Sequence, residues 1–286
     1  MLSRFRRPDA DLRIHLSETA LHAGDELKAR IDLVPKSSFL VRHGTVELIC
    51  TETYVQKTSS QYGTHYQKKT QTRAKLGETF SDNGTLRSGV KYSTDVVLIV
   101  PPDAPRSVSG TSVKSIQPGI SWEVKASLDV ANARDLYESL EVTVVERPSI
   151  DDAMSRPIVT EAGYRQCNLT LDVSSGNVGS GDRLDGRLRS DVFQDVAPTE
   201  VRAEVVRVEK FGNDAQDHIV DQVILERDVL LSADTTQEWR FQLNVGHVSV
   251  PSLKTEKSSV RWLVKGVLAR AMRTDLRVEQ EIAVDF

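Results

Sequence analysis

The sequence predicts an all-β protein built from two tandem immunoglobulin-like β-sandwich domains. Apolar and polar residues alternate along nearly every interpretable segment, as in half-buried antiparallel strands. No window longer than about ten residues shows a convincing helical period. The chain of 286 residues also contains an internal repeat, which divides it into two parts of roughly 140 residues each, an ordinary domain size.

The repeat is clearest at the end of each half. The segment Ser121–Leu128 resembles Arg261–Leu268, which lies 140 residues downstream, and the shift continues without a gap through the last expected strand. Residues 122–144 and 262–284 are identical at nine of 23 positions. We conclude that the chain is a tandem duplication, and we expect each copy to bury its own core.

The beginning of each half repeats at a shift of 157 residues. Gly24–Leu27 matches Gly181–Leu184, and so do the apolar residues before it: Leu12, Ile14 and Leu16 match Leu169, Leu171 and Val173. The two shifts differ because the first half has 17 additional residues before its tryptophan-led segment. If Pro105 is equated with Pro251, six of them follow Pro105, and eleven precede it in the polar run Tyr54–Lys75.

The first half is expected to contain five strands with one buried face each. In chain order, their apolar residues are Leu12, Ile14 and Leu16; Leu27, Ala29, Ile31 and Leu33; Val46, Leu48 and Cys50; Trp122, Val124, Ala126 and Leu128; and Leu140, Val142 and Val144. The continuous apolar run in Asp95–Val100 instead predicts a strand covered on both faces. Gly24–Asp25 predicts a turn, because glycine adopts a positive φ at little cost.

The second half follows the same order. Its apolar residues are Leu169, Leu171 and Val173; Leu184 and Leu188; Val201, Ala203 and Val205; Trp239, Phe241, Leu243 and Val245; Val264; and Ile282 and Val284. Trp122 and Trp262 are expected to fill equivalent core positions. Because prolines and an acidic pair mark the join, we assign residues 8–147 to the first domain, 148–163 to a linker and 164–286 to the second domain.

This order of elements resembles that of the arrestin-like superfamily, which includes the arrestins, the α-arrestins, the arrestin-like subunit of retromer and bacterial sporulation-control proteins. In each half, a Gly-Asp turn leads into a strand, and a later apolar strand ends at proline and serine, in Val100–Ser107 and Val248–Ser252. A tryptophan-led strand follows, and a Glu-apolar-x-Val strand comes last, in Glu141–Val144 and Glu281–Val284.

The resemblance covers nearly the full chain, Leu12–Phe286, and implies an arrestin-like adaptor or scaffold. We recognise neither the clathrin-binding tail of the receptor-binding arrestins nor the proline-tyrosine motifs of the α-arrestins. The endocytic role of those relatives is therefore not carried over, and what the resemblance implies is a two-domain scaffold.

No arrangement of residues indicates catalysis, and we expect a protein that is not an enzyme and has no cofactor or bound metal. The six histidines are scattered, and no two have the spacing of metal ligands. No glycine loop for phosphate and no nucleophile motif is present. Cys50 and Cys167 stand in different halves, each on an expected strand, and are interpreted as buried free thiols.

The formal net charge of -4 offers no general attraction to nucleic acid. No apolar run approaches the ~20 residues of a membrane span, and the basic start Arg4–Arg7 has no apolar stretch after it. We therefore expect a cytoplasmic protein, while Arg4–Arg7 could either fray or make a weak contact with an anionic surface. Its oligomeric state stays open.

One stretch is distinctly basic. Between Lys57 and Lys91, seven lysines and arginines face two acidic residues, for a net charge of +5. The candidate binding residues here are Lys57, Lys68, Lys69, Arg73 and Lys75. Either the lysines blunt the edge of a long hairpin, or they receive an acidic or phosphorylated segment of another protein.

The function predicted is that of a non-enzymatic arrestin-like adaptor or scaffold, which binds other proteins through sheet edges and the basic hairpin. One alternative is a regulatory protein of the sporulation-control type, acting in a signalling or developmental pathway. Another is an enzyme or carbohydrate-binding module on a sandwich fold, which an exposed aromatic cluster or a deep polar pocket would favour.

Overall fold

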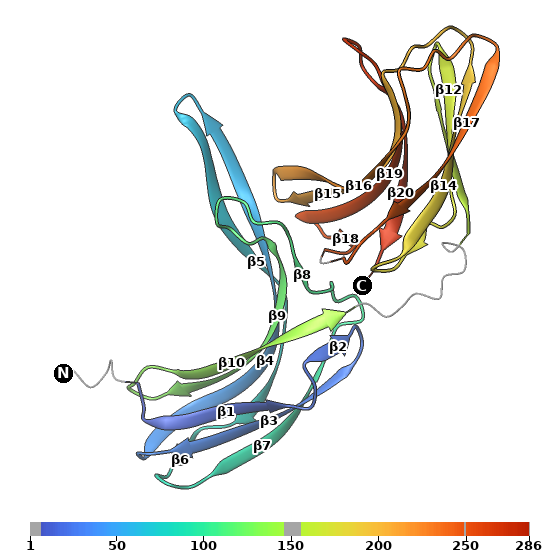
Figure 1. The fold of residues 1–286 in the computed structure, drawn as a ribbon. Coiled ribbons are helices and arrows are strands. Elements are labelled where there is room, and N and C mark those ends of the chain that lie inside the picture. Colours follow the sequence, from blue (N-terminus) through green and yellow to red (C-terminus); the bar gives the residue numbers. More distant parts are fainter. Residues whose placement is uncertain (1–6, 146–155, 249, 286) are drawn as a thin grey trace. The chain divides into compact units, whose positions relative to one another are not determined.

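The computed structural model describes residues 7–145, 156–248 and 250–285. Its strands form several sheets, and the described residues contain no helix (Figure 1). The chain divides into two compact units: Met1–Tyr54 with Gln67–Arg147, and Val55–Tyr66 with Pro148–Phe286. The described part contains no helix with the length and hydropathy that a membrane crossing requires.

The first unit contains two sheets. One has the order β1 (Ala10–Leu16), β3 (Glu26–Pro35) and β7 (Tyr92–Ile99). The other has the order β2 (Ala20–His22), β10 (Leu136–Val145), β9 (Gly119–Val130), β4 (Phe39–Ser60) and β5 (Gly63–Ser81). Two short strands complete it, β6 (Gly84–Leu86) beside β4 and β8 (Val108–Ser109) beside β9.

The second unit repeats this plan with one strand more in its first sheet and one fewer in its second sheet. Its first sheet has the order β11 (Ile158–Gly163), β12 (Cys167–Val173), β14 (Arg183–Val192) and β17 (Thr235–Asn244). Its second sheet has the order β13 (Asn177–Val178), β20 (Leu276–Val284), β19 (Ser258–Ala269), β15 (Glu200–Phe211) and β16 (Asp214–Arg227), with β18 (Leu253–Lys254) beside β19.

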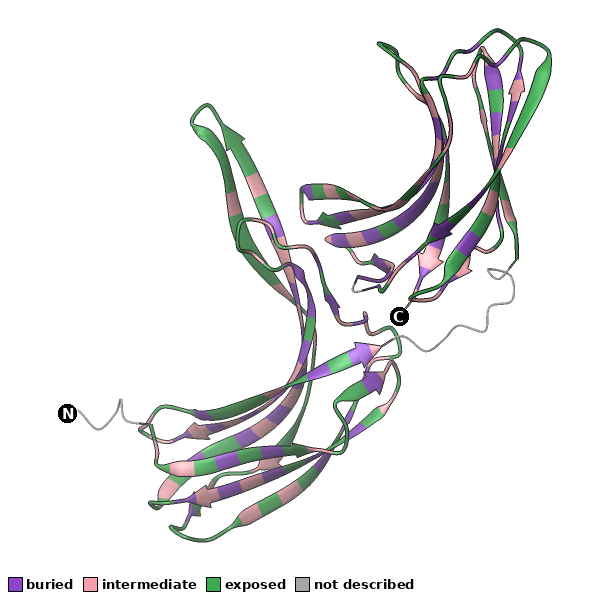
Figure 2. Cartoon of the chain, in the orientation of Figure 1, coloured by how far each residue is buried: buried purple, intermediate pink, exposed green. Residues whose placement is uncertain are grey.

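The alternation in the sequence becomes the alternation of buried and exposed residues along the strands (Figure 2). On β9, Trp122, Val124, Ala126 and Leu128 are buried at every second position, and on β3 so are Leu27, Ala29, Ile31 and Leu33. The two sheets of each unit pack these faces together, with β1 against β10 and β12 against β20. Each unit therefore has an architecture consistent with a β-sandwich.

The strand registers of the two units are related by the shifts seen in the sequence. Gly44 of β4 pairs with Leu128 of β9. Val201, 157 residues after Gly44, pairs with Leu268, 140 residues after Leu128. The tight turns agree too, because Gly24 and Gly181 both have φ of 85° and are followed by an aspartate. That aspartate, Asp25 or Asp182, accepts a backbone hydrogen bond from the residue three positions before it.

Trp122 and Trp262 occupy equivalent core positions, as predicted, with 0% and 1% of their surface exposed. The indole Nε1 of Trp122 donates to the carbonyl of Pro105 at 2.9 Å, and that of Trp262 donates to the carbonyl of Val250 at 3.2 Å. Pro105 therefore corresponds to Val250, and equating it with Pro251 was wrong by one residue. Strand register, which backbone hydrogen bonds set, does not have to follow the position of a proline.

The additional length of the first half of the chain is consequently divided differently from the prediction. Glu26 pairs with Ile99, whereas Arg183 pairs with Asn244, so the shift has fallen from 157 to 145 by the end of β7. Twelve additional residues lie before Pro105, not eleven, and five follow it, not six. The hairpin of β4 and β5 takes up the twelve, and its tip Val55–Tyr66 has that length.

Two expectations about single segments differ from the structure. Residues 148–155 of the expected linker lie outside the described residues, but Ile158–Gly163 forms strand β11, paired with β12. The run Asp95–Val100 is not covered on both faces: Val96 and Leu98 are buried, whereas Val97 and Ile99 are 47% and 58% exposed. An apolar run reports hydrophobicity but not which faces other elements cover.

Candidate functional site

The five predicted binding residues lie on the β4–β5 hairpin in two different environments. Lys57, Arg73 and Lys75 form ion pairs with Asp214, Glu52 and Glu47. Lys68 and Lys69 are exposed on β5, and neither has a carboxylate within 4 Å among the described residues. The free positive charge of the hairpin is thus concentrated on two adjacent lysines.

The contacts of Lys57 lie within the second unit, to which the hairpin tip belongs. Its Nζ lies 3.2 Å from Oδ1 of Asp214, and this hydrogen bond is the main cause of a raised lysine pKa. The backbone N–H of Lys57 donates to Oδ1 of Asn213 at 2.6 Å, and Nδ2 of Asn213 donates to the Lys57 carbonyl at 2.7 Å. The Asn213 amide therefore binds the backbone of the tip as a neighbouring strand would.

Arg73 binds a carboxylate in the interior of the first unit. Glu52 on β4 has no exposed surface, and both Nε and Nη2 of Arg73 approach its Oε2. A buried carboxylate is stable only when it is paired. Arg73 is therefore a structural residue, which sequence reasoning had grouped with the binding lysines.

A buried glutamate recurs at the equivalent position of the second unit. Glu209, 157 residues after Glu52, is 3% exposed. Its Oε1 lies 2.8 Å from Nε of Arg207 and 3.7 Å from Nε2 of His218. The shift of 145 places His218 at the position of Arg73. Sequence reasoning missed this pair, although extending the 157-residue repeat along β4 would have aligned Glu52 with Glu209.

The edge of β1 distinguishes the two units. In the second unit, β11 covers the outer edge of β12. In the first unit, β1 ends its sheet, and no strand pairs with its outer edge among residues 7–145. The backbone N–H of Ser17 donates a hydrogen bond to the carbonyl of Lys28, and that of Lys36 donates to the carbonyl of Asp9. In this antiparallel register, the odd-numbered residues of β1 therefore form the backbone hydrogen bonds to β3. The amides of Ala10, Leu12, Ile14 and Leu16 therefore point away from the sheet.

Residues just before β1 and just before β12 make equivalent side-chain contacts in the two units. Arg7 donates from Nη2 to the carbonyl of Tyr137 at 3.1 Å, and its guanidinium lies 5.5 Å from the centre of the Tyr137 ring. In the second unit, the hydroxyl of Tyr164 donates to the carbonyl of Arg277 at 2.6 Å. Arginine and tyrosine have thus exchanged places between the copies. Arg4–Arg6 lie outside the described residues.

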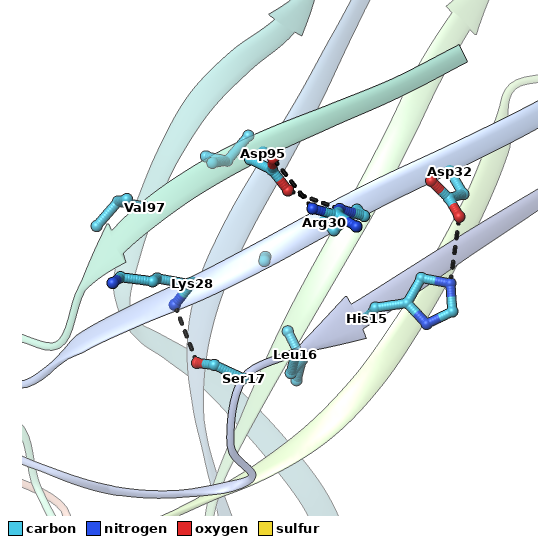
Figure 3. A pocket seen from close by; sticks show the side chains of 10 residues that line it. His15, Leu16, Ser17, Lys28, Arg30, Asp32, Asp95 and Val97 are labelled. Carbon is cyan, nitrogen blue, oxygen red and sulfur yellow. Dashed lines mark hydrogen bonds and ion pairs between the residues drawn. The ribbon is translucent and has the colours of Figure 1, made fainter. Parts of the chain in front are cut away.

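The first unit also has an open cavity of about 690 Å³ on the solvent face of the β1–β3–β7 sheet. We call it the outer trough; it is lined by side chains that include His15, Lys28, Arg30, Asp95 and Val97. Figure 3 shows Arg30 directed toward Asp95 and His15 directed toward Asp32. Sequence reasoning missed this cavity, because it arises from the side-by-side placement of three strands.

The thiols and potential ligands give no sign of reactive chemistry in the described part of the chain. Cys50 and Cys167 are buried, and burial raises the pKa of both thiols, that of Cys50 to about 12. A thiol with a high pKa is a poor nucleophile at neutral pH. Among the described residues, no three histidine, cysteine or carboxylate side chains are grouped to hold a metal ion.

Comparison with known proteins does not extend these observations. No protein-family model matches the chain, and no curated protein matches it. The resemblance to the arrestin-like superfamily therefore depends on the order of elements and the repeat described above.

Proposed function

We propose that the protein is a non-enzymatic adaptor or scaffold with two tandem immunoglobulin-like domains of the arrestin-like type. It binds an extended segment of another protein, which adds as a strand to the outer edge of β1. The basic hairpin offers a second contact to acidic or phosphorylated residues.

The observation that carries this proposal is the difference between the edges of β1 and β12. Both strands have the same place in related sheets, but among the described residues a further strand, β11, pairs with the outer edge of β12 and none pairs with the outer edge of β1. Four amides of β1 point outward, and an added strand would satisfy their hydrogen bonds. Because Leu12 and Ile14 are buried in the core, a partner would gain affinity there mainly from backbone hydrogen bonds.

Lys68 and Lys69 support the second contact. They are exposed cations without a carboxylate partner among the described residues, whereas Arg73 and Lys75 are already paired. Lysines also protect edge strands from aggregation, so their charge alone does not assign the role. Selectivity for acidic segments is the property that separates the two interpretations.

The β1 interaction can be tested by selecting peptides from a random display library on the full-length protein and locating them by amide hydrogen exchange. A bound peptide should slow exchange at Leu12, Ile14 and Leu16. Ala10→Pro removes an outward N–H without removing a β1–β3 bond, and should weaken binding about fivefold. Ala10→Ser, which keeps the N–H, is the control.

A negative result in these measurements would contradict strand addition at the outer edge of β1. Peptides that bind tightly without protecting the β1 amides would exclude strand addition there. For the second contact, Lys68→Glu with Lys69→Glu should abolish any preference for phosphorylated over unphosphorylated peptides, while Lys210→Glu in the second unit should preserve it. Arg73 is left unchanged in this variant, because replacing it would leave the buried Glu52 carboxylate without its counter-ion.

A further inference from the structure

The outer trough combines exposed apolar surface with cations on one face of a sheet. Val97, on β7, lines the trough and is 47% exposed, although it belongs to the most apolar run of the first half. Lys28 on β3 pairs in register with Val97. An ammonium group and an apolar side chain therefore stand beside each other at the trough.

Most of the charged groups at the trough neutralise one another. Nε of Arg30 donates to Oδ1 of Asp95 at 2.8 Å. Nζ of Lys91 lies 2.8 Å from Oδ2 of Asp32, and hydrogen bonds from Lys91 and Ser93 lower the pKa of this carboxyl. Lys28, by contrast, has no carboxylate within 4 Å among the described residues. It is a positive charge that the fold leaves unbalanced.

On the equivalent face of the second unit, the corresponding polar side chains have partners within the sheet. Positions 15, 28 and 97 correspond to Asp172, Asp185 and Gln242. Oδ2 of Asp172 accepts from Arg187 at 2.8 Å, and Oδ1 of Asp185 accepts from Gln242 at 2.9 Å. The second unit therefore satisfies these groups internally. In the first unit, two acidic positions are His15 and Lys28, and the amide position is Val97.

We infer that the outer trough is a binding site for a small soluble organic anion, a carboxylate or phosphate ester with a short apolar group. Lys28 pairs with the anion, His15 donates a hydrogen bond to it, and the apolar group covers Val97. A volume of about 690 Å³ suits a ligand of this class. The trough lies on the solvent face of the sheet, whereas strand addition would use the outer edge of β1, and the inference does not depend on the function proposed for that edge or for the hairpin.

The test uses full-length protein and hexyl phosphate, followed by NMR titration of backbone amides. Hexyl phosphate should shift amides of β1, β3 and β7 saturably, and it should bind more tightly than inorganic phosphate, hexan-1-ol or hexylamine. The triple change His15→Asp, Lys28→Asp and Val97→Gln installs the residues of the second unit. It should raise the Kd at least about tenfold, as loss of a charged contact predicts.

Arg13→Thr is the matched control, because it removes a cation from β1 outside the trough and installs the equivalent residue, Thr170. It should change the Kd less than the triple variant does, and well-dispersed spectra should show that both variants fold. Absence of saturable shifts, or equal binding by the triple variant, would overturn the inference. Lys28-dependent sedimentation with phosphatidylcholine vesicles containing phosphatidic acid, without hexyl phosphate binding, would assign a lipid headgroup instead.

Discussion

Glu52 and Glu209 place a carboxylate in the interior of each unit, and each lies beside at least one basic side chain. The basic partners differ, since Arg73 serves Glu52, whereas Arg207 and His218 lie at Glu209. Arg207 additionally stacks 5.7 Å from the centre of the Trp262 ring. A buried carboxylate at this position needs a basic partner, and the two units provide different partners for it.

Replacing one member of such a pair should be costly. Glu52→Ala should lower the free energy of unfolding of the first unit by about 2–3 kcal/mol, because it leaves the largely buried Arg73 without its counter-ion. Lys75→Ala, which breaks a pair whose lysine is 58% exposed, should cost below about 1 kcal/mol. Urea denaturation measures both. Equal losses would show that Glu52 has no special energetic role.

At the scale of the element, comparison of equivalent turns in the two units identifies a strained backbone conformation in the β19–β20 turn. Asn132 in the β9–β10 turn and Met272 in the β19–β20 turn are equivalent, with φ of 59° and 53°. Asparagine tolerates this left-handed conformation, whereas a methionine backbone is strained in it. Because Met272 is fully exposed, it gains no packing that would offset the strain.

Exchange of these two residues should therefore have opposite effects. Met272→Asn should raise the free energy of unfolding of the second unit by about 0.5–1 kcal/mol, and Asn132→Met should lower that of the first unit by a similar amount. Thermal unfolding of the two variants beside the parent protein measures both signs. A destabilised Met272→Asn protein would contradict the strain argument.

Strand β7 shows where reasoning at this scale was insufficient. The apolar run Asp95–Val100 predicted a strand here, but β7 begins three residues earlier, at Tyr92. The expected coverage on both faces was wrong, because β7 ends a three-stranded sheet whose outer face is open. The predicted basic cluster was also divided. Charge counting identified Lys68 and Lys69 together with Arg73 and Lys75, and only the pairing of β4 with β5 separates paired from unpaired cations.

At the scale of the whole molecule, we expect a destabilising substitution in the core of one unit to leave the stability of the other unit unchanged. Trp262→Ala should cost about 3–5 kcal/mol in the second unit by removing a fully buried indole. Phe193→Ala, at a half-exposed position of the same unit, should cost below about 1 kcal/mol. Native-state hydrogen exchange should show lost protection on β19 and β20 but not on β9 and β10. Equal loss in both units would mean that they unfold as one.

The sequence by itself determined the all-β class, the repeat and many of the core residues of both units, because alternation with period two and a constant shift can be read from the sequence directly. The predicted core residues Leu16, Leu140 and Trp239 are only half-buried, whereas Leu21 and Leu136 are core residues that the alternation did not identify. Only the tertiary structure decided which apolar residues lie open, which cations have partners and which sheet edge lacks a strand. Those properties depend on groups brought together from distant positions, such as Glu52 with Arg73 or Lys28 with Val97. No pattern within one segment contains that information.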